Sequence, residues 1–324
     1  MPAASSAQPL LLDTDIGTDI DDVYALVFAA VSPEFALRAV TVVNNDVVLR
    51  ARLARRVLDL MGRADVSVSL GAALSLTPGE RRGWMGHEGI GIQLSDEMTG
   101  GSVSSGEPSE AKKDAARRIA ECAQAAHAAG TPLLVCTIGA MTNLALALRC
   151  YPDEARRIGC VVAMAADFGG FGPENARVEH NIACDAVAAD IVLRSGLPVT
   201  LVGLNVTQQT AMTEEEVQAL EAIGGPLAEA LVGMHRAWFA AIRNTRSPMH
   251  DGLALASVVD PTLLTLVEAV PHVATRGPKP GAMTYDPPDG VQPTCRIATA
   301  VDAPRFHTLL QSRVRQAVAQ TKGG

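Results

Sequence analysis

The stretch LLLDTDIGTDIDDVYAL, Leu10 through Leu26, joins a short apolar run to a helix-like segment through a turn rich in acids. A run of leucines cut off by acids is typical of a buried strand, and the segment after the turn predicts a helix that ends at Pro33. No Lys or Arg interrupts the turn, and five carboxylates lie within ten residues: Asp13, Asp15, Asp19, Asp21 and Asp22.

The same alternation of apolar runs and helical segments continues along the chain. It predicts an α/β fold with a mostly parallel central sheet flanked by helices, in an open, Rossmann-like arrangement. Ligands of such sheets bind beyond the carboxyl ends of the strands, which is where the acidic turn lies. We expect a flexible N-terminus at 1–9, a single domain at 10–320 and a mobile Gly/Ser-rich loop at 96–110. Further strands are expected at 37–46, 66–72, 132–139, 158–167 and 197–207, and a helical segment broken near Gly224 at 213–246.

Composition excludes several classes of protein. The 324 residues carry a formal net charge of −8 without a basic cluster, which disfavours a nucleic-acid partner. No apolar run approaches the roughly 20 residues of a membrane span, so no membrane partner is expected. The six cysteines are scattered without a C-x-x-C motif and indicate reduced thiols. With no recognisable secretory signal, these features predict a cytoplasmic protein.

The crowded acids have a structural and a functional interpretation. One or two aspartates at a helix start cap free amides and suit the helix dipole. Five at one turn repel one another, and a cation would reverse that cost. Because the candidate ligands are hard oxygens, the pattern favours Ca²⁺ or Mg²⁺. An EF-hand does not fit, because Gly17 comes one position early and no Glu closes the loop.

A phosphotransferase of the haloacid-dehalogenase type is an alternative. DTDIGT after a strand is similar to the first motif of that family, with Asp13 as nucleophile and Asp15 as acid/base. The family also needs a late Lys followed by paired acids. None of the four lysines of this chain stands in that setting, so the alternative is disfavoured.

Three later segments bear on the choice: CTIGAMTNLALAL at 136–148, VEHN at 178–181 and SPMHDGLALASVVDP at 247–261. With the opening turn, and in the same order, they resemble the nucleoside hydrolase family, the calcium-dependent inosine–uridine-preferring ribohydrolases. The family's D-x-D-P-G-x-D-D corresponds to the opening turn, with Ile16 for Pro and two extra residues. Its G-N, T-G-P-L-T-N, E-F-N and H-D motifs correspond to residues 44–45, 138–143, 179–181 and 250–251.

The resemblance implies the nucleoside hydrolase fold and Ca²⁺-dependent hydrolysis of a ribonucleoside to ribose and free base. Water would attack C1′ through an oxocarbenium-like transition state, and the protein would be a homodimer or homotetramer. Asp15 would be the general base and His250 the general acid. The implied Ca²⁺ ligands are Asp15, Asp22, Asp251 and the carbonyl of Ile138. The implied ribose contacts are Asp21, Asn45, Met164, Asn175, Glu179 and Asn181.

The base pocket is the least constrained part of this hypothesis. The helix LVGMHRAWFAAIRNTR offers His235 and Trp238 as candidate base-binding residues, although an aromatic on a helix is more often part of the core. His87 lies two residues beyond the position of the family's loop histidine. These departures leave open an unusual or modified nucleoside as substrate, or a nucleoside- or ribose-binding protein without catalysis.

Overall fold

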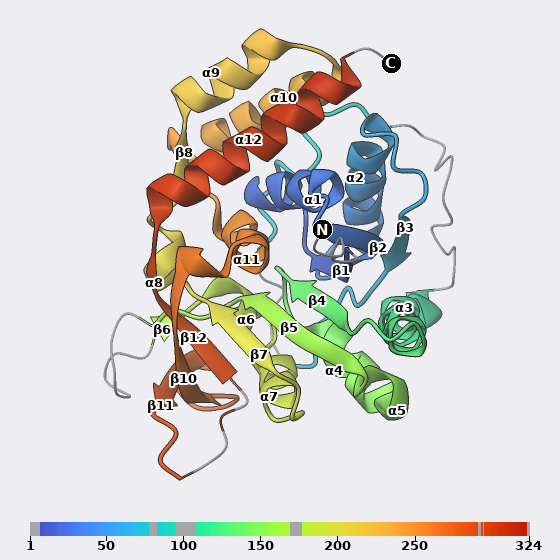
Figure 1. Cartoon of the computed structure of the whole chain (residues 1–324), viewed down its shortest axis with the longest axis vertical. Coiled ribbons are helices and arrows are strands. Elements are labelled where there is room, and N and C mark those ends of the chain that lie inside the picture. The colour runs from blue at the N-terminus through green and yellow to red at the C-terminus, as the bar shows by residue number, and fades with distance from the viewer. Residues whose placement is uncertain are drawn as a thin grey trace, which may run out of the picture.

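The computed structural model describes residues 7–77, 83–94, 108–168, 177–290, 293 and 295–322, with side chains from residue 114 in the helix that begins at 108. It confirms the predicted α/β fold (Figure 1). A ten-stranded mixed sheet has the order β3-β2-β1-β4-β5-β7-β12-β10-β11-β6, and β8 pairs with β9 apart from it. The strands are β1 (Gln8–Thr14), β2 (Phe35–Val42), β3 (Ser67–Leu70), β4 (Leu133–Thr137), β5 (Ile158–Met164), β6 (Arg177–Val178), β7 (Val199–Val202), β8 (Ala211–Thr213), β9 (Arg246–Pro248), β10 (Leu264–Val273), β11 (Ala282–Asp286) and β12 (Cys295–Val301).

Strand β1 lies inside the sheet, between β2 and β4, and is parallel to both. Its three leucines are fully buried because helices cover both faces of the sheet, which explains an uninterrupted apolar run. The strand begins at Gln8, inside the segment expected to be a flexible N-terminus. Its register brings Asp13 level with Thr41 of β2 and Thr137 of β4, so the acidic turn emerges where neighbouring strands also end.

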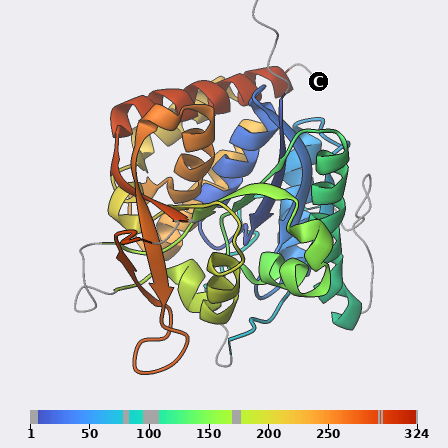
Figure 2. The same cartoon turned by 60° about the horizontal axis from the view of Figure 1, so that its bottom comes forward.

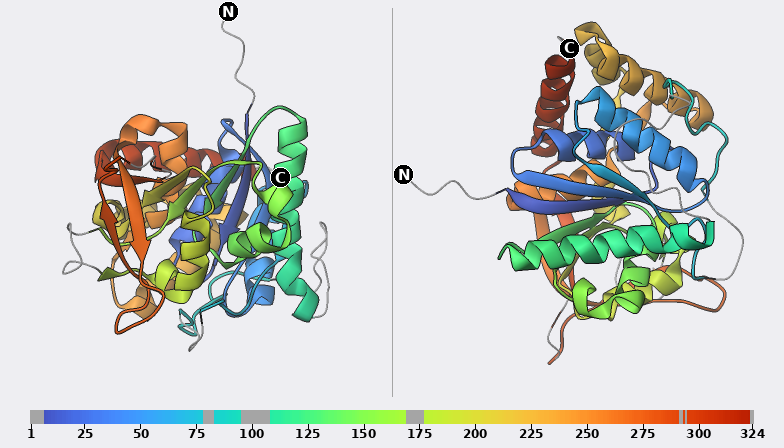
Figure 3. Two further views of the ribbon diagram at one scale, coloured as in Figure 1. Left: turned by 90° about the horizontal axis from the view of Figure 1, so that it is seen from below. Right: turned by 90° about the vertical axis from the view of Figure 1, so that its right-hand side faces the viewer.

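Helices form a layer on each face of the sheet (Figure 3). One layer contains α1, α2, α11 and α12, with α9 and α10 packed outside it, and the other contains α3, α4, α5 and α7. The helices are α1 (Asp21–Val31), α2 (Val47–Leu60), α3 (Pro108–Ala128), α4 (Thr142–Cys150), α5 (Pro152–Ala155), α6 (His180–Cys184), α7 (Ala186–Leu193), α8 (Leu204–Thr207), α9 (Glu214–Ile223), α10 (Pro226–Ile242), α11 (His250–Val259) and α12 (Ala303–Thr321), with a 3₁₀ turn at Pro261–Leu263.

The C-terminal third departs from simple βαβ repetition. Strands β10, β11 and β12 lie on the side of the sheet away from β3 (Figure 2). Here β12 is parallel to β7, whereas β10 and β11 are antiparallel to their neighbours. None of the helices in the described ranges is both long enough and apolar enough to cross a membrane.

Several predicted boundaries were wrong, and in two of them a turn ends the element early. The strand expected at 197–207 stops at Val202, and Leu204–Thr207 form helix α8, whose amides at Val206 and Thr207 bond back to the Gly203 carbonyl. The helical segment expected at 213–246 divides at Gly224 as predicted. Its second helix ends at Ile242, because Arg243 adopts a left-handed conformation (φ 56°).

Candidate active site at the carboxyl ends of the strands

A cavity of about 90 Å³ lies beyond the carboxyl ends of β1, β4 and β5. Segments far apart in the sequence meet there: the acidic turn, the end of β4, the start of α6 and the start of α11. Nine residues that the sequence assigned to ligand, substrate or catalytic roles line this cavity. They are Asp15, Asp21, Asp22, Ile138, Met164, Glu179, Asn181, His250 and Asp251.

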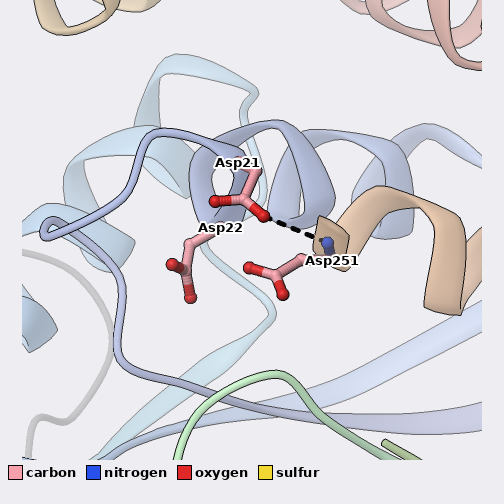
Figure 4. A group of neighbouring side chains, drawn as sticks. All are labelled: Asp21, Asp22 and Asp251. Atoms are coloured by element: carbon pink, nitrogen blue, oxygen red, sulfur yellow. Dashed lines mark hydrogen bonds between the residues drawn. The ribbon is translucent and has the colours of Figure 1, made fainter. Parts of the chain in front are cut away.

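Three carboxylates form the tightest acidic group in the cavity. Oxygens of Asp21, Asp22 and Asp251 lie within 4.8 Å of one another, and all three residues are buried. Figure 4 shows them gathered between the start of α1 and the start of α11. The backbone amide of Asp251 donates a 3.1 Å hydrogen bond to Asp21 Oδ2, which ties the two helix starts together.

Burial and mutual repulsion hold protons on this group. Desolvation, aided by the charge of Asp19, raises the pKa of Asp21 to about 8. Desolvation and the neighbouring carboxylates also raise the pKa values of Asp22 and Asp251 well above the usual range. A cation of hard character would reverse this cost, and three buried carboxylate ligands fit Ca²⁺. The geometry thus adds Asp21, which the sequence assigned to ribose, to the candidate ligand set.

Asp15 and Ile138 lie beside this group rather than within it. The amide of Ile138 donates to the Asp13 carbonyl at 2.8 Å, which joins the ends of β4 and β1. The next residue must be glycine, because a Cβ at Gly139 would lie 2.9 Å from both the amide nitrogen and Oδ1 of Asp15. Asp15, Asp22 and Asp251 all line the cavity, and the charge of Asp15 contributes to the raised pKa values of the other two.

A buried arginine holds the acidic turn in place. Arg50, 1% exposed, donates from α2 to the carbonyl of Ile16 at 2.9 Å, to Thr18 Oγ1 at 3.0 Å and to the carbonyl of Asn44 at 2.7 Å. Within the turn, the Thr14 hydroxyl donates to Asp22 and accepts from the amide of Ile16 at 3.0 Å. Hydrogen bonds from Arg50 and hydrogen bonds within the turn therefore both fix the conformation of the turn.

Replacing Arg50 by Met should destabilise the protein by about 3 kcal/mol or more, because buried acceptors lose their donors at about 1–3 kcal/mol each. Urea unfolding would measure the change. Arg56→Met on the same helix is the matched control, since Arg56 is only partly buried. Equal unfolding midpoints for the two variants would show that the turn does not depend on Arg50.

His250 begins α11 and contacts the short helix α8. Its Nδ1 lies 2.6 Å from Thr207 Oγ1, which leaves Nε2 as the ring nitrogen able to act on a substrate. Burial lowers the pKa of His250 to about 4, so the ring is neutral at pH 7. The tautomer with its proton on Nε2 is the one in which Nδ1 accepts a hydrogen bond from the Thr207 hydroxyl.

Glu179 and Asn181 shape the side of the cavity next to β5. The Glu179 carboxylate caps α6 and accepts hydrogen bonds of 2.7 to 3.1 Å from the amides of Asn181, Ile182 and Ala166. Asn181 Nδ2 donates to the carbonyls of Ile138 and Met164, both at 3.0 Å. Glu179 therefore caps the helix, as a Glu directly before a helix suggests. Both Glu179 and Asn181 also line the cavity.

The remaining predicted residues lie elsewhere. His235 is fully buried, with Tyr24 Oη 2.9 Å from Nδ1 and Ser247 Oγ 2.6 Å from Nε2, and so belongs to the core. Trp238 lies beside the acidic turn and donates from Nε1 to Asp19 Oδ1 at 2.8 Å. Asn45 is buried in a left-handed conformation (φ 58°) and does not line the cavity. Asn175 falls outside the described residues.

Four lining residues had no role predicted from the sequence: Thr18, Asp19, His180 and Leu204. His180 Nε2 lies 4.0 Å from Asp15 Oδ2 and 3.4 Å from Cys184 Sγ. Its position between Glu179 and Asn181, both predicted site residues, was the sequence signal that could have indicated it. Leu204 gave none, because its segment predicted a strand. His87 lies beneath the turn instead, with Nε2 2.7 Å from the carbonyl of Thr18.

Comparison with known proteins gives consistent matches over nearly the whole chain. The sequence model of the inosine-uridine preferring nucleoside hydrolase family matches residues 10–308. A pyrimidine-specific ribonucleoside hydrolase, RihA of Enterobacter sp. (strain 638), is 30% identical over 96% of this chain and 98% of its own. The solved purine-preferring ribonucleoside hydrolase from Gardnerella vaginalis is also 30% identical, with a TM-score of 0.83 over 96% and 99% of the two chains. An inosine-guanosine nucleoside hydrolase is 25% identical, with a TM-score of 0.80 over 95% and 98%.

Proposed function

The chain belongs to the inosine-uridine preferring nucleoside hydrolase family and is a nucleoside N-ribohydrolase, and we propose that its activity depends on Ca²⁺ held in the acidic cavity. The observation that carries this proposal is the buried group of Asp21, Asp22 and Asp251, whose oxygens lie within 4.8 Å of one another. Without a cation such a group is costly, and the hard oxygens match what Ca²⁺ prefers.

Several of the lining residues have a part in the proposed reaction. Bound Ca²⁺ would orient a water molecule and lower its pKa. Asp15 would accept the proton of that water as it attacks C1′. Asn181 would bind the ribose diol, and Met164 would pack beneath the sugar. As the ribosyl ring becomes positive, the surrounding carboxylates stabilise it.

The leaving base needs a donor, because a purine or pyrimidine anion departs poorly. His250 would act as that donor: its neutral ring would hydrogen-bond the departing base from Nε2, which is free of the contact that holds Nδ1, and so stabilise the negative charge that develops on the base. Which base it serves does not follow from similarity, because equally similar relatives differ. At 30% identity, one relative is named pyrimidine-specific and another purine-preferring.

Removing the metal should abolish activity. We expect release of reducing sugar from inosine, uridine, adenosine or cytidine with Ca²⁺, a loss of at least about 100-fold in excess chelator, and recovery when Ca²⁺ is restored. Calcium should also raise the melting temperature, because it binds only the folded cluster. Turnover that persists in chelator would contradict the metal dependence. A nucleoside-induced thermal shift without turnover of any substrate would instead favour a binding protein.

We also propose that the protein is a homodimer or homotetramer, as the resemblance implies. Light scattering on the Ca²⁺-loaded chain would measure this directly. A monomeric mass would contradict the proposal and leave the catalytic one untouched.

A further inference from the structure

Asp19 is an acid of the opening turn without a place in the metal group or in the proposed chemistry. It lies in the opening turn, between Thr18 and Ile20. Unlike its four acidic neighbours in the turn, it is exposed. Its side chain lines the same cavity as the buried carboxylates, so it can meet a bound substrate.

The side chain of Asp19 is held in place although it is exposed. Trp238 Nε1 donates to its Oδ1 at 2.8 Å, which leaves Oδ2 as the oxygen able to contact a ligand. The preceding residue is fixed as well: His87 Nε2 lies 2.7 Å from the carbonyl of Thr18, and Arg50 donates to the Thr18 hydroxyl at 3.0 Å. A surface aspartate rarely has this much support, because an exposed side chain gains little stability from being fixed.

Asp19 and His250 line the same cavity, together with the buried carboxylates of Asp21, Asp22 and Asp251. His250 is the residue that the proposed function places at the base. A base within reach of His250 therefore also comes near Asp19.

We propose that Asp19 determines base specificity by accepting a hydrogen bond from the exocyclic amino group of the leaving base. A carboxylate only accepts hydrogen bonds, so it attracts an amino group and repels a carbonyl oxygen at the same position. Pairing of Asp with the amino group of cytosine is an established mode of base recognition. This inference rests on the proposed function and refines it: cytidine is preferred to uridine, and adenosine to inosine. Trp238 is the positioning residue for Asp19.

The test uses pairs of substrates that differ only at the amino or keto position. For each pair that the enzyme hydrolyses, the ratio of kcat/KM, amino over keto, should be roughly tenfold or more in the natural protein and fall toward one in Asp19→Asn. The amide of Asn both donates and accepts, so it loses the discrimination while keeping the size of the side chain. Trp238→Phe should lower the same ratio by a smaller factor, which a merely structural role would not do.

Two further measurements separate this inference from the proposed function. Asp46→Asn, at the exposed N-cap of α2, is the matched control and should keep the natural ratio. 4-Nitrophenyl riboside reports ribosyl hydrolysis without any nucleobase. If the natural protein hydrolyses neither it nor any nucleoside, the proposed function fails. If it hydrolyses them with amino and keto members equal, or if Asp19→Asn slows both members equally, the specificity role alone is overturned.

Discussion

Replacing Asp22 by Asn is expected to lower kcat/KM for ribonucleosides by about 10³-fold or more, because it removes a candidate charged ligand from the buried group. Calorimetric titration should show a matching loss of Ca²⁺ affinity. The Thr14 hydroxyl that donates to Asp22 can donate equally to the amide oxygen of Asn, so the local fold should persist. Undiminished Ca²⁺ binding in this variant would contradict the assignment of the metal site.

The same substitution should make the calcium-free protein more stable. Burial and the charges of Asp15 and Asp21 raise the pKa of Asp22, so ionising it costs folding free energy. An acid whose pKa is raised on folding contributes full stability below its unfolded value of 3.8 and loses it progressively as pH rises from there toward the raised folded value. The gain from Asn should therefore be absent near pH 4 and reach a few degrees of melting temperature near pH 8.

Melting curves in chelator at the two pH values measure this gain. Asp46→Asn is again the matched control, because an exposed N-cap tolerates Asn nearly as well as Asp. In Ca²⁺ the order should reverse, with the natural protein more stable than Asp22→Asn. If Asp22→Asn is less stable than the natural protein in chelator at pH 8, repulsion among the carboxylates does not destabilise the calcium-free protein.

The acidic turn shows how much of the fold and of the site could be predicted from local sequence. Leucines cut off by acids predict a buried strand and a site at its end, and both β1 and the cavity lie there. Asp251 is different, since 230 residues separate it from Asp21, and only an ordered set of motifs linked it to the turn. Arg50 gave no signal, because an arginine in a predicted helix is expected to face solvent.

The helix α10 shows why the remaining site residues could not be placed. His235 and Trp238 are three residues apart, so the helical period puts them on one face without saying what that face meets. In the fold, His235 lies against Tyr24 and Ser247, whereas Trp238 reaches Asp19. Tertiary packing determines which of the two side chains lies in the core and which lies near the site. The sequence of the helix alone does not indicate this.

Replacing His250 by Ala should lower kcat for nucleosides by about 10²- to 10⁴-fold, the range typical of a lost general acid. The loss should be much smaller for 4-nitrophenyl riboside, because nitrophenolate leaves without a proton. The comparison of the two substrates isolates the leaving-group role from any effect on ribose or metal. Equal losses for both would contradict that role and place His250 among the residues that only shape the cavity.

Removing the contact between Thr207 and His250 gives a second test of the leaving-group role of His250, with a smaller expected effect. The Thr207 hydroxyl lies 2.6 Å from His250 Nδ1, and its removal in Thr207→Val keeps the shape of the side chain. Burial lowers the pKa of His250 to about 4, so the ring is neutral at pH 7, and a hydrogen bond from the Thr207 hydroxyl to Nδ1 would keep its single proton on Nε2. Thr207→Val should therefore slow nucleosides more than 4-nitrophenyl riboside, as His250→Ala does but by a smaller factor. A loss in Thr207→Val that is the same for both substrates would show that the threonine orients the helix and not the proton.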